Sequence, residues 1–173
     1  MIVRSVAITL VIGACIPVLA QAATCPTVNE LRFEIKRSGA KATLDASYAN
    51  SERWNCILEG IESATSAWLS VASILYSESD AGTSSELGDS VVSAFEKRPT
   101  SVLAVVQEKA APQRLSVRTV CNPALEPRKG YRAFFNRMEK RLTMLDKAGL
   151  SRKKELCLTI VRRARLALSN PSK

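Results

Sequence analysis

Apolar residues recur at helical spacing through the middle of this chain, and this periodicity limits the fold more than any other feature of the sequence. Within residues 51–106 they return every three or four positions, as at Trp54, Ile57 and Ile61, which places them on one face of a helix. The breaks between periodic stretches carry turn-forming residues, as at 79–82. We therefore expect an all-α fold, built as a compact array of short antiparallel helices.

Capping patterns predict where the first helices begin and end. Thr27 and Glu30 form a capping-box pattern at the start of a helix that should end near Arg37, with Gly39 in a left-handed conformation. Residues 40–50 are weakly patterned and fit either a loose helix or a linker.

Three further starts are expected in the central stretch. Ser51 is expected to cap the helix that carries Trp54. Thr83 and Glu86 form a second capping-box pattern, and Pro99 suits the first position of another short helix.

The last third of the chain predicts a loop followed by two helices. Residues 109–127 contain three prolines and little periodicity, so we expect a loop there, held by Cys121. Gly149 is expected to end the first helix and Ser151 to cap the second. The predicted inward face of that last helix consists of Leu156, Cys157, Ile160, Val161, Ala164 and Leu168.

The first 22 residues have the organisation of a signal peptide. Arg4 supplies a positive charge, residues 6–20 are apolar but too few to span a membrane, and 20–22 form a small-x-small cleavage pattern. We therefore predict a signal peptide over residues 1–22 and a single exported helical domain over 23–173, without a transmembrane segment. The expected location is the periplasm or the outside of a Gram-negative bacterium. In an alternative interpretation, residues 12–15 resemble a lipobox and Cys15 anchors a lipoprotein.

Export changes the interpretation of the remaining cysteines. Cys25, Cys56, Cys121 and Cys157 are an even number in an oxidising compartment, which favours two disulfides among three connectivities. We favour Cys25–Cys56 and Cys121–Cys157, because each pair joins a loop or a helix start to a nearby helix. A zinc site would need four scattered thiolates, so no metal site is expected.

Positive charge is concentrated toward the C-terminus. Residues 128–165 contain thirteen Lys or Arg and three acids, whereas residues 23–127 contain ten basic and thirteen acidic residues. This basic face has two possible explanations. It is either a solvated surface that can also complement the acidic front half, or it binds an anionic envelope component or another protein. Nucleic acid is not an expected partner, because the chain is exported and has no basic-aromatic recognition module. The candidate anion-binding residues are Arg152, Lys154, Arg162, Arg163 and Arg165.

The chain contains no histidine, and this weighs against catalysis. Histidine is the commonest general base and metal ligand, and it is the usual partner of a serine or cysteine nucleophile. Glu59 and Glu62 are neighbouring carboxylates, but such pairs usually lie on a solvated helix face, and Asp80 suits a turn or a helix cap. We expect no catalytic residue and no cofactor.

A set of turn, cap and core residues resembles a group of small exported helical proteins of proteobacteria, which have no assigned activity. The resemblance covers about residues 52–160 and implies export and an all-helical fold, with no activity or site to carry over. At Phe95 the chain departs from the smaller aliphatic residue common in such sequences. The matching residues are Trp68-Leu69, Ser79-Asp80-Ala81-Gly82, Glu86-Leu87, Ala94, Pro99, Val102-Leu103, Val120-Cys121 and Cys157-Leu158.

These features together predict a non-catalytic binding or interaction protein. An inhibitor, an immunity-type protein or an envelope accessory factor would each fit. The alternative is a cationic protein that contacts anionic lipid or polysaccharide of the envelope through its basic C-terminal helices.

Overall fold

The described part of the chain is helical. The computed structural model describes residues 25–109, 113–122 and 130–169, and these contain no strand longer than one bridge between Gln107 and Ser116. The predicted signal peptide (1–22) and Cys15 lie outside the described residues. The helices are α1 (Val28–Ser38), α2 (Ala40–Tyr48), α3 (Ser51–Glu62), α4 (Ser66–Ser77), α5 (Ala81–Lys97), α6 (Pro99–Val105), α7 (Val117–Cys121), α8 (Tyr131–Thr143), the short 3-10 helix η1 (Ala148–Leu150) and α9 (Ser151–Ser169).

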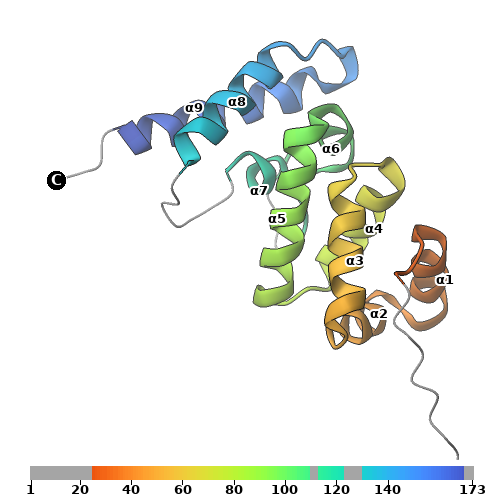
Figure 1. Ribbon diagram of the computed structural model, residues 1–173. Helices are drawn as coiled ribbons and strands as arrows, with labels where there is room; N and C mark the ends of the chain where they lie inside the picture. Colours follow the sequence, from red (N-terminus) through yellow and green to blue (C-terminus); the bar gives the residue numbers. More distant parts are fainter. Residues whose placement is uncertain (1–24, 110–112, 123–129, 170–173) are drawn as a thin grey trace, which may run out of the picture.

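The helices form a central group with a pair on either side. Helices α3, α4 and α5 pack against one another at the centre (Figure 1). The pair α1–α2 covers one side of this group, and the α8–α9 hairpin lies at the other side, where α7 packs against both α5 and α9. The prediction of a compact helical array is confirmed.

One cluster of buried apolar side chains continues through all these helices. Leu31 of α1, Leu69 of α4 and Val161 of α9 all belong to it and are fully buried. Burying a side chain of this size stabilises the fold by about 1.5–3 kcal/mol. Trp54 is a core residue, whereas Trp68 is only partly buried and packs at the edge of the cluster.

Two disulfides each connect a helix to a segment that precedes it by more than thirty residues. Cys25 pairs with Cys56 in α3, and Cys121 at the end of α7 pairs with Cys157 in α9. The Cα–Cα distances are 5.3 and 5.4 Å. Of the three connectivities, the favoured one is therefore confirmed. Disulfides of this kind are compatible with an oxidising compartment.

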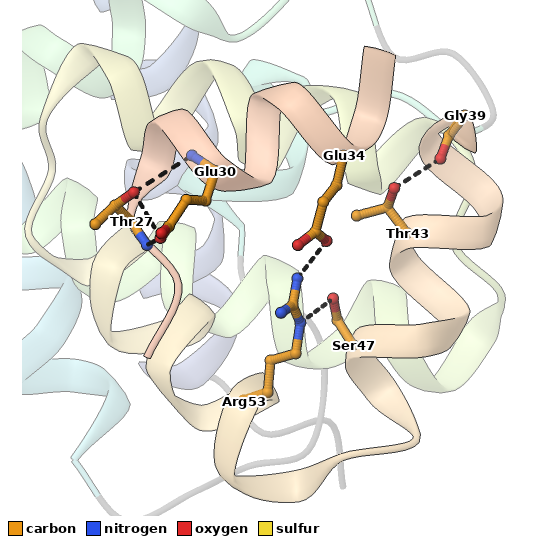
Figure 2. Close-up of polar contacts among 7 residues, drawn as sticks. All are labelled: Thr27, Glu30, Glu34, Gly39, Thr43, Ser47 and Arg53. Carbon is orange, nitrogen blue, oxygen red and sulfur yellow. Dashed lines mark hydrogen bonds and ion pairs between the residues drawn. The ribbon is translucent and has the colours of Figure 1, made fainter. Parts of the chain in front are cut away.

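The first helix begins as its sequence predicts. The Thr27 hydroxyl accepts from the amide of Glu30, and the Glu30 carboxylate accepts from the amide of Thr27 at 2.7 Å (Figure 2). The Thr27 amide and hydroxyl both donate to the Glu30 carboxylate, and these two hydrogen bonds hold the pKa of Glu30 below its ordinary value. Gly39 has a positive φ of 88°, but its ψ of 157° lies outside the left-handed helical region. It joins α1 directly to α2, so residues 40–48 are a regular helix rather than a linker.

Arg53 of α3 connects the α1–α2 pair to the central helices. Its guanidinium is ion-paired with Glu34 of α1 and donates to the hydroxyl of Ser47 in α2 at 3.1 Å (Figure 2). Ser47 is fully buried, so this bond satisfies a polar group that would otherwise cost free energy. Thr43 donates to the Gly39 carbonyl at 2.8 Å, which anchors the start of α2.

Two predicted caps in the central stretch were wrong, the first by one residue and the second by three. Asn50, not Ser51, caps α3, because its side chain accepts from the amide of Arg53 at 3.0 Å. Asp80, not Thr83, caps α5, with Thr83 completing the capping box. The helix thus begins at Ala81. Pro99 occupies the first turn of α6 as predicted.

The third wrong cap lies in the last third of the chain. Helix α8 ends at Thr143, well before Gly149, which lies inside η1. Ser151 is the first residue of α9, and its hydroxyl donates to the Ala148 carbonyl at 3.0 Å instead of capping α9.

The predicted loop 109–127 contains helix α7, so that expectation was also wrong. Ser116 caps α7 and forms a capping box with Thr119. The amide of Gln107 donates to Leu115, and its carbonyl accepts from Val117 at 2.8 Å, which fixes the approach to the helix. The remainder of the predicted loop, 110–112 and 123–127, lies outside the described residues.

Gly60 allows α3 to approach α4 closely. A Cβ atom at this position would lie 2.5 Å from the ring of Trp68, well inside contact distance. We expect Gly60→Ala to lower the free energy of unfolding by about 1–3 kcal/mol, because the ring must move. Gly88→Ala in α5 is the matched control, since nothing lies within 4 Å of its Cβ position. For Gly88→Ala we expect the free energy of unfolding to rise by about 0.5–1 kcal/mol, because alanine is the better helix former. Urea unfolding measures both changes.

Candidate functional site

Two of the predicted anion-binding arginines bind within the protein. Arg162 and Arg165 lie three residues apart on one face of α9 and both bind the carboxylate of Glu139 in α8. The Arg162 Nε–Glu139 Oε1 distance is 2.8 Å. They therefore close the α8–α9 hairpin. This one carboxylate offsets one of the two positive charges and holds both guanidinium groups against α8.

Arg152 and Lys154 also have partners inside the molecule. Arg152 is ion-paired with Glu108 at 2.9 Å, and Lys154 donates to the Leu145 carbonyl at 2.9 Å. Their neighbour Lys153 donates to the Leu103 carbonyl at 2.9 Å, near the end of α6. A lysine satisfies carbonyls that a helix end leaves without partners. Arg152 and Lys153 thus hold the start of α9 against the end of α6 and the residues after it, whereas the Lys154 bond lies within the C-terminal hairpin.

Arg163 is the predicted residue that faces a different surface. It lies about 100° around α9 from Arg162 and lines a groove of about 530 Å³ between α7 and α9. Arg118 of α7 lines the same groove. Both side chains are exposed, and neither has an ion-pair or hydrogen-bond partner among the described residues.

The rest of the groove is mainly apolar. Leu156, Ile160, Ala164 and Ala167 follow one another along one side of α9. Leu156 was predicted to face inward, but it is 38% exposed. The buried residues of α9 are Cys157 and Val161, as predicted, together with Leu158. Ile160, Ala164 and Leu168 are partly buried against the core, and Leu156 lies at the border between core and groove.

The two walls of this groove are covalently joined. Cys121 lies one helical turn after Arg118, and Cys157 follows Leu156 directly in α9. Both sulfur-bearing residues are buried. The disulfide therefore fixes the relative position of the two helices that carry the groove residues. Cys157 points inward, as predicted.

Sequence analysis missed the α7 side of this groove. Arg118 and Asn122 were not considered, because the segment that contains them was predicted to be a loop. The available signal was Ser116, whose spacing to Thr119 allows a short helix to be capped. A helix of five residues has no measurable periodicity, so the side on which Arg118 lies was not predictable.

The carboxylates weighed as catalytic candidates lie in separate places. Glu59 is exposed on α3, whereas Glu62 is ion-paired with Lys97 of α5 at 3.2 Å. Asp80 caps α5, as its turn-or-cap interpretation predicted. The groove between α7 and α9 is lined by none of the three.

The cap at Asp80 predicts a pH dependence of stability. The amide of Thr83 donates to the Asp80 carboxylate at 2.9 Å and lowers the pKa of that group. A carboxyl group whose pKa is lowered by folding stabilises the fold at pH values above its ordinary pKa, near 4. This stabilisation is lost as the pH falls through the lowered pKa. Asp80→Asn keeps an acceptor but does not titrate. At about pH 6 we expect the wild type to unfold at a higher temperature than Asp80→Asn. This difference in melting temperature should shrink as the pH is lowered toward about 2. An advantage that is the same across this range would contradict the charged cap.

No helix within the described ranges is long and apolar enough to cross a membrane. Comparisons with protein-family models, with curated proteins and with solved structures found no match to this chain. The resemblance to exported proteobacterial proteins therefore stays a prediction from the sequence.

Proposed function

We propose that the protein is an exported, non-catalytic binding protein that uses the groove between α7 and α9 to contact a negatively charged partner. The observation that carries this proposal is the contrast among the arginines of α9. Arg152, Arg162 and Arg165 have acidic partners, whereas Arg163 lines a groove beside Arg118 and no acid among the described residues neutralises it.

The shape and chemistry of the groove support binding. Ligand sites are usually concave and largely apolar, with a few polar groups that fix orientation. Here the apolar side of α9 supplies the surface, while two guanidinium groups supply the polar contacts. Guanidinium groups are suited to carboxylates and phosphates because their fixed fork of donors matches two oxygen acceptors.

The alternative function is binding of a whole anionic envelope surface through the basic C-terminal hairpin. It is favoured by the charge of residues 128–165. Against it, Arg137 and Arg152 pair with Glu96 and Glu108 of the front half, and two more arginines share the carboxylate of Glu139. Dispersed surface charge that is paired internally contributes little to binding a second surface.

In-cell photo-crosslinking tests the proposed function. The full chain, carrying benzoylphenylalanine at Thr159 in the groove, is exported in a Gram-negative host and illuminated. We expect a discrete adduct whose yield falls about fivefold in Arg118→Glu/Arg163→Glu, the effect of losing about 1 kcal/mol of binding. Lys140→Glu/Lys147→Glu makes the same change in net charge at exposed sites outside the groove and should leave the yield unchanged.

Two results would contradict the groove as the binding site. One is equal adduct yield from Thr159 and from Glu52, which is exposed on α3. The other is an equal loss in both charge-reversal pairs. The second result, together with salt-sensitive cosedimentation on anionic vesicles, would support the envelope-surface alternative.

A further inference from the structure

We infer that the ligand of the α7–α9 groove is a small single-chain amphiphile, with an apolar chain and a carboxylate or phosphate head. This inference rests on the proposed function and specifies its ligand. It is drawn from the size of the groove, the order of its lining residues along α9 and the position of its two arginines.

The groove has the size of a small-molecule site. Its volume of about 530 Å³ lies within the range of small-ligand pockets, about 300–1,000 Å³. Eight residues line it, whereas a stable protein interface uses about 20–30 residues on each side. A folded protein partner would therefore have to bind mainly outside the groove.

The apolar residues of the groove form a single stripe along α9. Leu156, Ile160, Ala164 and Ala167 are separated by three or four residues, so they form one stripe along α9. From the first to the last of them, the helix rises about 16 Å. An elongated chain fits a stripe of this shape better than a compact ring system does.

The polar groups favour an anionic head on that chain. Arg163 lies between the apolar residues of α9, and Arg118 and Asn122 line the groove from α7. Two guanidinium groups and one amide can together donate several hydrogen bonds to one carboxylate or phosphate. A neutral ligand would leave both positive charges without a counter-charge, so the groove should discriminate against it.

Titration of the labelled mature protein with defined probes tests this inference. The probes are dodecanoate and dodecyl phosphate below their micelle concentrations, glycerol monododecanoate as the neutral chain, and inorganic phosphate as the head without a chain. We expect amide shifts of α7 and α9 with the two anionic chains. The neutral chain should bind about tenfold more weakly, and inorganic phosphate should not saturate.

Three variants locate the head and the chain. Arg118→Gln/Arg163→Gln should weaken dodecanoate about tenfold and leave the neutral chain unchanged. Ala167→Trp, at an exposed position, should fill the groove and weaken both chains. The control Lys140→Gln/Lys147→Gln should bind like the wild type. Circular dichroism confirms that each variant is folded.

The outcomes separate this inference from the proposed function. Equal affinity for dodecanoate in the arginine variant and its control would overturn the anionic head, and no groove shifts with any chain would overturn the amphiphile. Groove shifts with an acidic helical peptide instead, together with the Thr159 adduct, would leave the proposed function standing with a protein partner. Inorganic phosphate that binds as tightly as dodecyl phosphate would show that the head alone is recognised and would also overturn the amphiphile.

Discussion

Replacing Cys121 and Cys157 by alanine is expected to lower the free energy of unfolding by about 4 kcal/mol. The bond closes a segment with a sequence separation of 36, and its loss returns that chain entropy to the unfolded state. It also releases α7 from α9, so binding to the groove should be lost at temperatures where the protein stays folded. Urea unfolding and titration with dodecanoate measure the two effects.

The other disulfide is the matched control. Cys25–Cys56 has a sequence separation of 31, so its removal should destabilise the protein by a similar amount. Because it joins the start of the chain to α3, groove binding should remain in Cys25→Ala/Cys56→Ala. Loss of binding in both double variants, or in neither, would show that the Cys121–Cys157 bond does not hold the walls of the groove.

Trp54→Ala is expected to be the most destabilising substitution of a single residue in the central helices, at about 3–5 kcal/mol. The indole is 3% exposed, and its Nε1 donates to the Glu86 carboxylate at 2.6 Å. It also makes an edge contact with the ring of Tyr48, at a centroid distance of 5.4 Å. Truncation removes this packing and leaves a cavity between α3 and α5.

Trp54→Phe separates packing from hydrogen bonding at the same site. Most of the aromatic volume is kept, while the bond to Glu86 is lost, so the cost should be about 1–2 kcal/mol. Glu86 keeps the hydrogen bond that it accepts from the Tyr48 hydroxyl at 3.3 Å. Equal losses for the two substitutions, measured by urea unfolding, would show that the hydrogen bond and not the packing carries the effect.

The fold was predictable from the sequence where helices are long enough to show a periodicity. The capping of α5 shows where local patterns stop being sufficient. Both Asp80 with Thr83 and Thr83 with Glu86 fit a capping box, and the structure uses the first. The Glu86 carboxylate instead accepts a hydrogen bond from the indole of Trp54, which lies 32 residues earlier in α3. A local pattern contains no information about that contact.

The candidate site was predictable only in part, for a similar reason. Arg162, Arg163 and Arg165 are equivalent in the sequence, and the position of Glu139 on α8 distinguishes them. The position of Arg118 in the groove depends on the five-residue helix α7, which is stabilised by its tertiary contacts and by the disulfide at Cys121. The charge count of a segment therefore indicated where cations are concentrated, and the packing of helices decided which of them face a groove.

The order of the disulfides along the chain has a consequence for biogenesis. Cys25 is bonded to the next cysteine of the described sequence, Cys56, and Cys121 is bonded to Cys157, so the two covalent loops do not overlap. A chain that emerges N-terminus first into an oxidising compartment can close the first loop before Cys121 appears. A thiol oxidase acting on successive cysteines then yields the native pairing directly. For the exported protein that we propose, we expect maturation to depend on an oxidase and to be insensitive to loss of a disulfide isomerase.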